Sequence, residues 1–254
     1  MLCSKEYLPE LSYMSYDVVV AVMYLTSYLM LMGAVFFVLQ YFKDTEISNT
    51  LNLLSIVLLL TSFFMLQKQA NDFADTAQNS HQEFHQGFRY MNWLLDIPIL
   101  IILFHKFQKK NGIPVFLCIL GVLMVLTGYF ARFLEIEKCD TVYYIFLNVI
   151  SILCFVFIIL KLKPKNYTIN FKFNIIDTNS VYTLFVFSWF LYIPAYFADA
   201  RYRLSSPQKI LSTEIVTQQL LFSLADILSK LVFSVAIFYA NFYAKKKKLD
   251  GLGG

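Results

Sequence analysis

Long apolar runs separated by short polar breaks dominate the chain between residues 18 and 244. A helix that crosses a bilayer needs roughly 20 mostly apolar residues, and lipid leaves backbone groups unpaired unless they bond within the segment. Runs of this kind therefore predict helices rather than strands. Seven runs fit, and they cover residues 18–42, 51–69, 90–104, 113–130, 142–160, 181–198 and 213–244. We expect the last run, which is longer than one crossing requires, to project beyond the membrane.

Composition agrees with a membrane protein. Hydrophobic residues make up 58% of the 254 residues and charged residues only 15%. A soluble domain has about 45–50% apolar residues and about 25% charged residues. The runs and their loops use nearly the whole chain, which predicts one seven-helix domain over residues 1–254. It would have a short extracellular segment at 1–16 and a basic tail at 245–254. With no nucleophile–base constellation in the sequence, an enzyme is not expected.

Basic residues are unevenly divided between the two ends of the predicted helices. One end collects Lys43, the lysines near residues 106–110 and 161–172, and the run 245–248. Loops rich in lysine and arginine stay in the cytoplasm. This end is therefore expected to be cytoplasmic, with the N-terminus outside. Beside a membrane, four consecutive lysines fit lipid headgroups better than nucleic acid.

Four ionisable side chains lie inside predicted spans: Arg89 and Asp96 on the third, Asp226 and Lys230 on the seventh. An ionisable group in a membrane helix is costly, which makes it a functional candidate by default. Two positive and two negative charges limit this cost by pairing. The set fits either a salt-bridge network that ties two helices together or a functional centre.

Helical spacing groups these charges with other residues. Arg89, Asn92, Trp93 and Asp96 follow the i, i+3, i+4, i+7 pattern and share one face of the third span. By the same rule Asp226 and Lys230 lie one turn apart on the seventh.

Aromatic residues form a similar stripe on the sixth span, at Trp189, Tyr192 and Tyr196. Flat rings near Lys230 would form a slot for a flat, apolar ligand linked to that lysine. Taken alone, an aromatic stripe is more often a sign of plain helix packing than of a ligand slot.

Three segments carry a resemblance to a known family. Residues 88–98 (FRYMNWLLDIP) resemble the third helix of microbial (type 1) rhodopsins, and residues 223–230 (SLADILSK) resemble their seventh, in which the lysine binds retinal. Residues 188–192 (SWFLY) resemble the sixth-helix wall of the retinal pocket. The resemblance implies an all-α seven-helix fold in the plasma membrane of a microbe. All-trans retinal would lie in the bundle interior, joined to Lys230 as a protonated Schiff base. The implied retinal pocket also includes Trp93, Trp189, Tyr192, Tyr196 and Pro98.

Three third-helix positions distinguish the ions that the family transports. Light-driven sodium pumps have Asn, Asp and Gln there, and this chain has Asn92, Asp96 and Leu103. The resemblance is therefore to the sodium-pump branch, and it implies an outward cation pump. Asp96 would be counterion and proton acceptor, with Asn92 and Asp226 holding sodium transiently and Arg89 blocking back-leak from outside.

Other positions of the implied ion path both support and weaken this assignment. Asn52, Ser55, Thr61 and Gln69 resemble the second helix of the sodium pumps, and Glu135 resembles a position after their fourth. Three residues depart from the pattern: Leu103 replaces Gln, Phe238 replaces Gly and Gln218 replaces Arg. We expect Leu103 and Phe238 to make cytoplasmic ion uptake the weak step.

Two alternatives stay open at this stage. One is a proton pump with Asp96 as acceptor, although the lack of a carboxylate at position 103 argues against a fast cytoplasmic proton donor. The other is a light sensor or light-gated channel of the same fold. The transported ion could also be another alkali cation, and the resemblance implies a homo-oligomer, with a pentamer as the expected form.

Overall fold

The computed structural model describes residues 13–43, 46–78, 87–137, 141–165, 167, 177–197 and 212–250. These residues are almost entirely helical. The helices are α1 (Tyr13–Tyr41), α2 (Glu46–Gln78), α3 (Gly87–Phe107), α4 (Val115–Glu137), α5 (Thr141–Leu162), α6 (Thr178–Phe190), α7 (Tyr192–Phe197), α9 (Ser212–Asp226), the π-helical η1 (Ile227–Val232) and α10 (Phe233–Asp250). The predicted all-α fold is confirmed.

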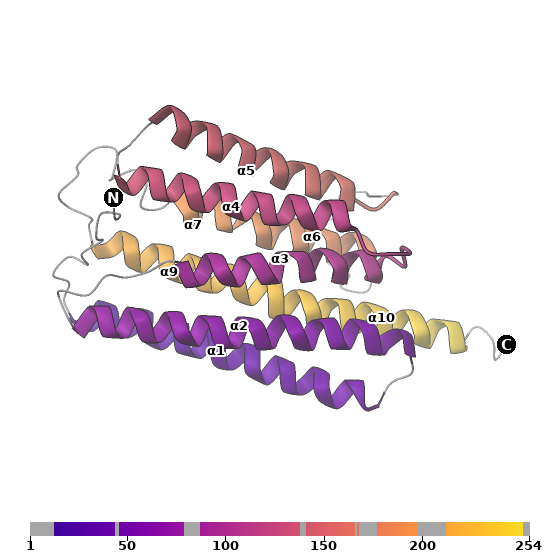
Figure 1. Ribbon diagram of the computed structural model, residues 1–254. Coiled ribbons are helices and arrows are strands. Elements are labelled where there is room, and N and C mark those ends of the chain that lie inside the picture. The colour runs from indigo at the N-terminus through magenta and orange to yellow at the C-terminus, as the bar shows by residue number, and fades with distance from the viewer. Residues whose placement is uncertain are drawn as a thin grey trace.

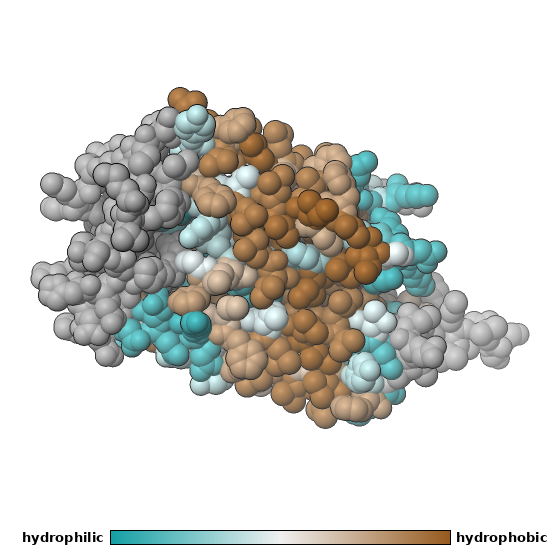
Figure 2. All heavy atoms as spheres, in the orientation of Figure 1, coloured by the Kyte–Doolittle hydropathy of each residue, from teal (hydrophilic) through white to brown (hydrophobic). Residues whose placement is uncertain are grey.

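Seven helical runs in the described part are long and apolar enough to cross a membrane, which confirms the seven predicted spans. The sixth consists of α6 and α7, and the seventh of α9, η1 and α10. Figure 2 shows a band of apolar residues across the bundle with hydrophilic residues on either side of it, as a bilayer requires. The C-terminal helix continues to Asp250, beyond the apolar part of its span.

The helices form a bundle of nearly parallel rods (Figure 1). From α1 to α5 each helix packs against its neighbour in the chain, and α9 closes the bundle by packing against α1 and α7. The ends of α1, α3 and α5 lie toward the same end of the bundle as the C-terminus. The basic residues that follow these helices are therefore gathered at one end.

The sixth span is interrupted at Leu191, between α6 and α7. Pro194 has no backbone N–H and cannot bond the carbonyl of Phe190, where α6 ends. Backbone hydrogen bonds of the helical type flank the break. The amide of Leu191 donates to the carbonyl of Phe187, and the amide of Ala195 donates to the carbonyl of Leu191. The break divides the predicted aromatic stripe between two helices.

The seventh span contains a π-helical segment at Lys230 that the sequence did not predict. A π-bulge widens one turn of a helix and occurs often at functional sites. The segment also lies very close to α1, because a Cβ at Gly33 would collide with Cδ1 of Leu231. Only glycine fits this position without moving Leu231.

Candidate functional site

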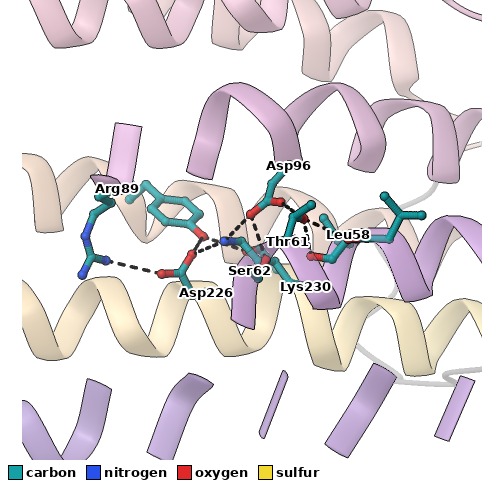
Figure 3. A network of polar contacts seen from close by, with 10 residues as sticks. Leu58, Thr61, Ser62, Arg89, Asp96, Asp226 and Lys230 are labelled. Atoms are coloured by element: carbon teal, nitrogen blue, oxygen red, sulfur yellow. Dashed lines mark hydrogen bonds and ion pairs between the residues drawn. The ribbon is translucent and has the colours of Figure 1, made fainter. Parts of the chain in front are cut away.

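Lys230 lies at the centre of the bundle between two carboxylates (Figure 3). Its Nζ is 2.7 Å from Oδ2 of Asp96 on α3 and 2.8 Å from Oδ1 of Asp226 at the end of α9. All three side chains are at most 1% exposed. The predicted grouping of these residues is confirmed, and the ammonium group is paired on both sides.

Two hydroxyl groups of α2 donate to Asp96. Thr61 donates to Oδ1 at 2.9 Å, and Ser62 donates to Oδ2 at 2.8 Å. Thr61 was predicted to lie on the ion path, and the structure places it against Asp96. Each oxygen of this carboxylate therefore has its own hydroxyl donor.

Besides Lys230 of η1, Asp226 contacts side chains from α7 and α3. Tyr192 of α7 donates to its Oδ1 at 2.7 Å, and the same hydroxyl lies 2.9 Å from the hydroxyl of Ser229. The guanidinium of Arg89 lies 3.3 Å from the other oxygen, Oδ2. Tyr192 thus contributes a hydrogen bond to the charged centre as well as an aromatic ring.

Arg89 is enclosed by neutral groups apart from Asp226. It donates to the side-chain oxygen of Gln219 at 2.8 Å and stacks over the ring of Phe222, 4.4 Å from its centroid. The side-chain amide of Gln69 is oriented so that both its oxygen and its nitrogen have partners. In this orientation its oxygen accepts a hydrogen bond from Nε of Arg89 at 3.0 Å. The predicted path residue Gln69 therefore positions the arginine that was predicted to block back-leak.

Asn92 is completely buried on the same helix face as Arg89 and Asp96. Neither end of its amide has a hydrogen-bond partner among the residues that the structure describes. Buried polar groups are nearly always paired, and an unpaired amide calls for a water molecule, an ion or another ligand. Asn92 is therefore available to bind something that the protein itself does not supply.

A cavity runs from Lys230 between α3, α4, α5, α6 and α7. It encloses about 880 Å³ of space free of protein atoms, its open mouth included. The predicted retinal contacts Trp93, Trp189, Tyr192 and Tyr196 line it, whereas Pro98 does not. From α3, the nearby residues Ile97 and Leu100 line the cavity instead.

This cavity fits retinal, the group that the sequence resemblance implies. Retinal is a long apolar molecule that ends in an aldehyde, and the cavity is lined mostly by apolar and aromatic side chains and reaches the primary amine of Lys230. Trp93 packs edge-on against Tyr192 and Phe222, with ring centroids 5.2 and 5.3 Å apart, which holds the wall rigid. The residues present can therefore hold the chromophore and form its covalent link.

The predicted cytoplasmic path is closed by apolar side chains. Leu103 is fully buried in a core cluster with Phe104 and Phe185, whereas Phe238 packs against Phe36 of α1 in a separate cluster. The structure therefore does not place Leu103 and Phe238 in one constriction.

The remaining predicted path residues are spread over three helices. Asn52 and Ser55 are buried on α2, and the amide nitrogen of Asn52 has no partner among the described residues. Gln218 is buried on α9 next to Gln219. Glu135 belongs to α4, but its side chain lies outside the described part of the structure.

A bundle of seven membrane-crossing helices around an internal ligand cavity defines the class of this protein. The profile of the family described as bacteriorhodopsin-like proteins matches residues 18–244. The chain therefore belongs to the bacteriorhodopsin-like family of microbial rhodopsins, which carry retinal and are not enzymes. A comparison with curated protein sequences finds no match.

Solved structures confirm the fold. Xanthorhodopsin, described as a light-driven ion pump with dual chromophore, superimposes with a TM-score of 0.75 at 19% identity, covering 95% of this chain and 99% of that one. A thermophilic rhodopsin gives 0.76 at 20% identity, with coverages of 96% and 99%. A light-driven proton pump from Leptosphaeria maculans gives 0.63 at 14% identity, with coverages of 90% and 96%. Identities this low show the shared fold alone.

Four residues of the charged centre escaped the sequence analysis: Ser62, Gln219, Phe222 and Ser229. Their spacing contained a usable signal, because Gln219, Phe222 and Asp226 repeat at the 3/4/7 interval on one face of the seventh span. Ser62 follows Thr61 directly and gives no such signal. Its contact with Asp96 depends on how α2 is rotated against α3.

Proposed function

We propose that this protein is a light-driven outward cation pump that exports sodium, with retinal bound covalently to Lys230. The observation that supports sodium most directly is Asn92, a buried neutral amide without a partner beside a charged centre that is already balanced. A carboxylate at this position would add a second proton acceptor to the third helix. An amide offers instead an oxygen ligand that does not titrate, as suits a hard cation.

Retinal, when bound, supplies light absorption and a change of shape that redirects the proton on the nitrogen of Lys230. The chain supplies the acceptor. Oδ2 of Asp96 lies 2.7 Å from Nζ, which is within direct hydrogen-bond reach. As the proton passes from Nζ to Oδ2, both residues become neutral and the positive barrier at the centre of the bundle disappears.

A cation that reaches the centre in this state meets oxygen ligands rather than an ammonium group. Asn92 and Asp226 are the proposed transient sodium ligands. Return of the proton from Asp96 to Nζ then restores the positive charge behind the ion. Arg89, held by Gln69 and Gln219, lies beyond Asp226 as seen from Lys230 (Figure 3) and opposes return of the ion.

A proton pump is the alternative that a specific observation favours. The direct pair between Lys230 and Asp96 serves proton export equally well, and the similar structure from Leptosphaeria maculans is described as a light-driven proton pump. Against it, position 103, where outward proton pumps of the family carry a carboxylate, holds the buried Leu103. A light sensor or light-gated channel would use the same centre without net transport.

The proposed orientation puts the C-terminus in the cytoplasm, because the basic ends of several helices lie together at that end of the bundle. The expected location is the plasma membrane of a microbe. A homo-oligomer, with a pentamer as the expected form, stays a prediction from the family resemblance.

Light-induced pH changes in cells that express the protein test the proposed ion. Cells are suspended in unbuffered sodium or potassium salt, with and without a protonophore. Sodium export drives protons inward passively, so the medium should become alkaline in sodium and the change should survive or grow with protonophore. Acidification in both salts that the protonophore abolishes would establish the proton pump. An unchanged pH in both salts would favour a light sensor, which transports no ion.

A further inference from the structure

The two hydroxyl groups that bind Asp96 differ in their other contacts (Figure 3). The hydroxyl of Thr61 lies 2.9 Å from the carbonyl oxygens of both Val57 and Leu58, in addition to Asp96. It has one proton for three acceptors, so it can release Asp96 and still donate a hydrogen bond within its own helix.

Ser62 makes no such second contact where its hydroxyl lies in the structure. Among the residues that the structure describes, its hydroxyl bonds only to Oδ2 of Asp96, at 2.8 Å, and the side chain is completely buried. The same oxygen lies 2.7 Å from Nζ of Lys230. Ser62 and Lys230 therefore bind one carboxylate oxygen, the one that the proposed function makes the proton acceptor.

These contacts oppose protonation of Asp96. A hydroxyl that donates to a carboxylate stabilises the ionised form, and the stabilisation is larger than that of a bond between neutral groups. When a proton leaves Nζ and forms an O–H bond at Oδ2, that oxygen becomes neutral and accepts the hydrogen bond of Ser62 more weakly. The hydroxyl of Ser62 keeps its own proton and can turn toward a carbonyl of its own helix turn.

We propose that Ser62 is a positioning residue that holds Asp96 ionised in the dark and sets how readily Oδ2 accepts the proton of Lys230. Thr61 orients the opposite oxygen and adapts when the charge changes. This inference rests on the proposed roles of Lys230 and Asp96, and it assigns Ser62 a function that the sequence alone did not indicate.

Acid titration of the colour of the retinal-bound protein tests this role without measuring transport. Protonation of the counterion shifts the absorption of the chromophore, so the midpoint of the shift reports when Asp96 takes up a proton. Ser62→Ala removes a donor to the anion, so protonation should occur at higher pH. One hydrogen bond to a charged group predicts an upward shift of roughly 1 pH unit, or about 1.4 kcal/mol.

Two further variants distinguish this role from a general packing effect. Ser62→Thr keeps the hydroxyl and should restore a midpoint close to that of the unchanged protein. Ser27→Ala is the matched control, because Ser27 is equally buried in α1 and bonds to the carbonyl of Tyr24 rather than to a carboxylate. Its midpoint should not move. An unchanged midpoint in Ser62→Ala, or an equal shift in Ser27→Ala, would overturn the proposal.

The double variant with Asp96→Asn tests whether Ser62 acts through Asp96. Any change that Ser62→Ala causes in the absorption maximum should vanish when residue 96 is already an amide, since coupled residues give non-additive effects. An undiminished change would show that Ser62 acts on another group, and the inference would be wrong. Failure of the unchanged protein to gain colour with retinal would overturn the proposed function as well. Colour without any effect of Ser62 would overturn this inference alone.

Discussion

Lys230 lies where burial of a charged amine is unfavourable in free energy, and its two carboxylate partners offset this cost. Asp96 and Asp226 lie within 2.8 Å of Nζ, and the three side chains are shielded from solvent. Breaking a buried ion pair by removing one partner costs about 3–5 kcal/mol. The centre is therefore a structural element of the bundle as well as the proposed site of chemistry.

Replacement of Lys230 by alanine tests the proposed attachment of retinal. Lys230→Ala should give a protein that stays in the membrane but gains no visible absorption when retinal is added, because no primary amine ends the cavity. Lys68→Ala is the control, because Lys68 is exposed on α2 and lies over the ring of Phe88. It should gain full colour. Visible absorption in Lys230→Ala would show that retinal is attached to another lysine.

At the scale of single residues, sequence reasoning found the charges and missed their neutral partners. Arg89, Asp96, Asp226 and Lys230 stand out because charges are rare in apolar helices, and their spacing places them on two faces. Ser62 carries no local signal, whereas Gln219 carries only its helical spacing to Phe222 and Asp226. Whether they bond Asp96 or Arg89 depends on the rotation and depth of neighbouring helices, which only the folded structure fixes.

At the scale of helices, a close contact between α3 and α4 fixes one wall of the ligand cavity. A Cβ at Gly121 would lie 2.7 Å from Cγ2 of Ile97 and 3.1 Å from Cδ1 of Ile101. Ile97 lines the cavity, and as a β-branched residue it has little rotamer freedom in a helix. Glycine at position 121 therefore lets α4 approach without pushing Ile97 toward the ligand.

Gly121→Ala should consequently shift the absorption maximum of the retinal-bound protein and slow the uptake of added retinal. Overpacking of this kind destabilises a protein by about 1–3 kcal/mol, so the temperature at which colour is lost should also fall. Gly87→Ala is a matched control at the start of α3, where an added Cβ meets nothing within 4 Å. Equal behaviour of the two variants would show that the contact at Gly121 does not shape the cavity.

Apolar packing at the end of the bundle proposed to be cytoplasmic makes ion uptake the expected slow step. The rings of Phe104 and Phe185 stack at 5.4 Å, Phe233 lies against both, and all three are fully buried beside Leu103. An ion would have to lose its water to pass here. Leu103 lies within this apolar cluster, while Phe238 belongs to the packing against α1.

Leu103→Gln should bring water into this cluster and speed the recovery of dark absorption after a flash in sodium. The buried amide should also lower the stability of the protein by about 1–3 kcal/mol. Leu59→Gln provides the control, because Leu59 is equally buried but belongs to the cluster against α1. Faster recovery in Leu59→Gln as well would attribute the effect to general loosening rather than to the path.

Helices were more predictable than their irregularities. Apolar runs predicted all seven spans, since length and hydropathy are set by the membrane itself. A signal for the break at Leu191 was present in Pro194, which follows it by three residues. The π-helical segment at Ile227–Val232 has no proline or glycine to mark it in the sequence.

At the scale of the whole molecule, the two ends of the bundle differ in charge. Lys106, Lys110, Lys163 and Lys165 gather beyond the apolar band at one end, and partial burial together with the charge of Lys165 lowers the pKa of Lys110. Such an end fits the anionic headgroups of a cytoplasmic leaflet. The proposed direction of transport, away from this end, follows from the same asymmetry.

Sodium carried by light across a sealed membrane is the most direct test of the account. Inside-out vesicles from cells that express the protein are loaded with retinal, mixed with radioactive sodium and illuminated in the presence of a protonophore. Export from the cytoplasmic face predicts accumulation of sodium inside these vesicles, and Lys230→Ala vesicles should accumulate none. If illuminated vesicles gain no sodium, and without protonophore they gain protons instead, the centre at Lys230 and Asp96 transports protons and the sodium assignment is wrong.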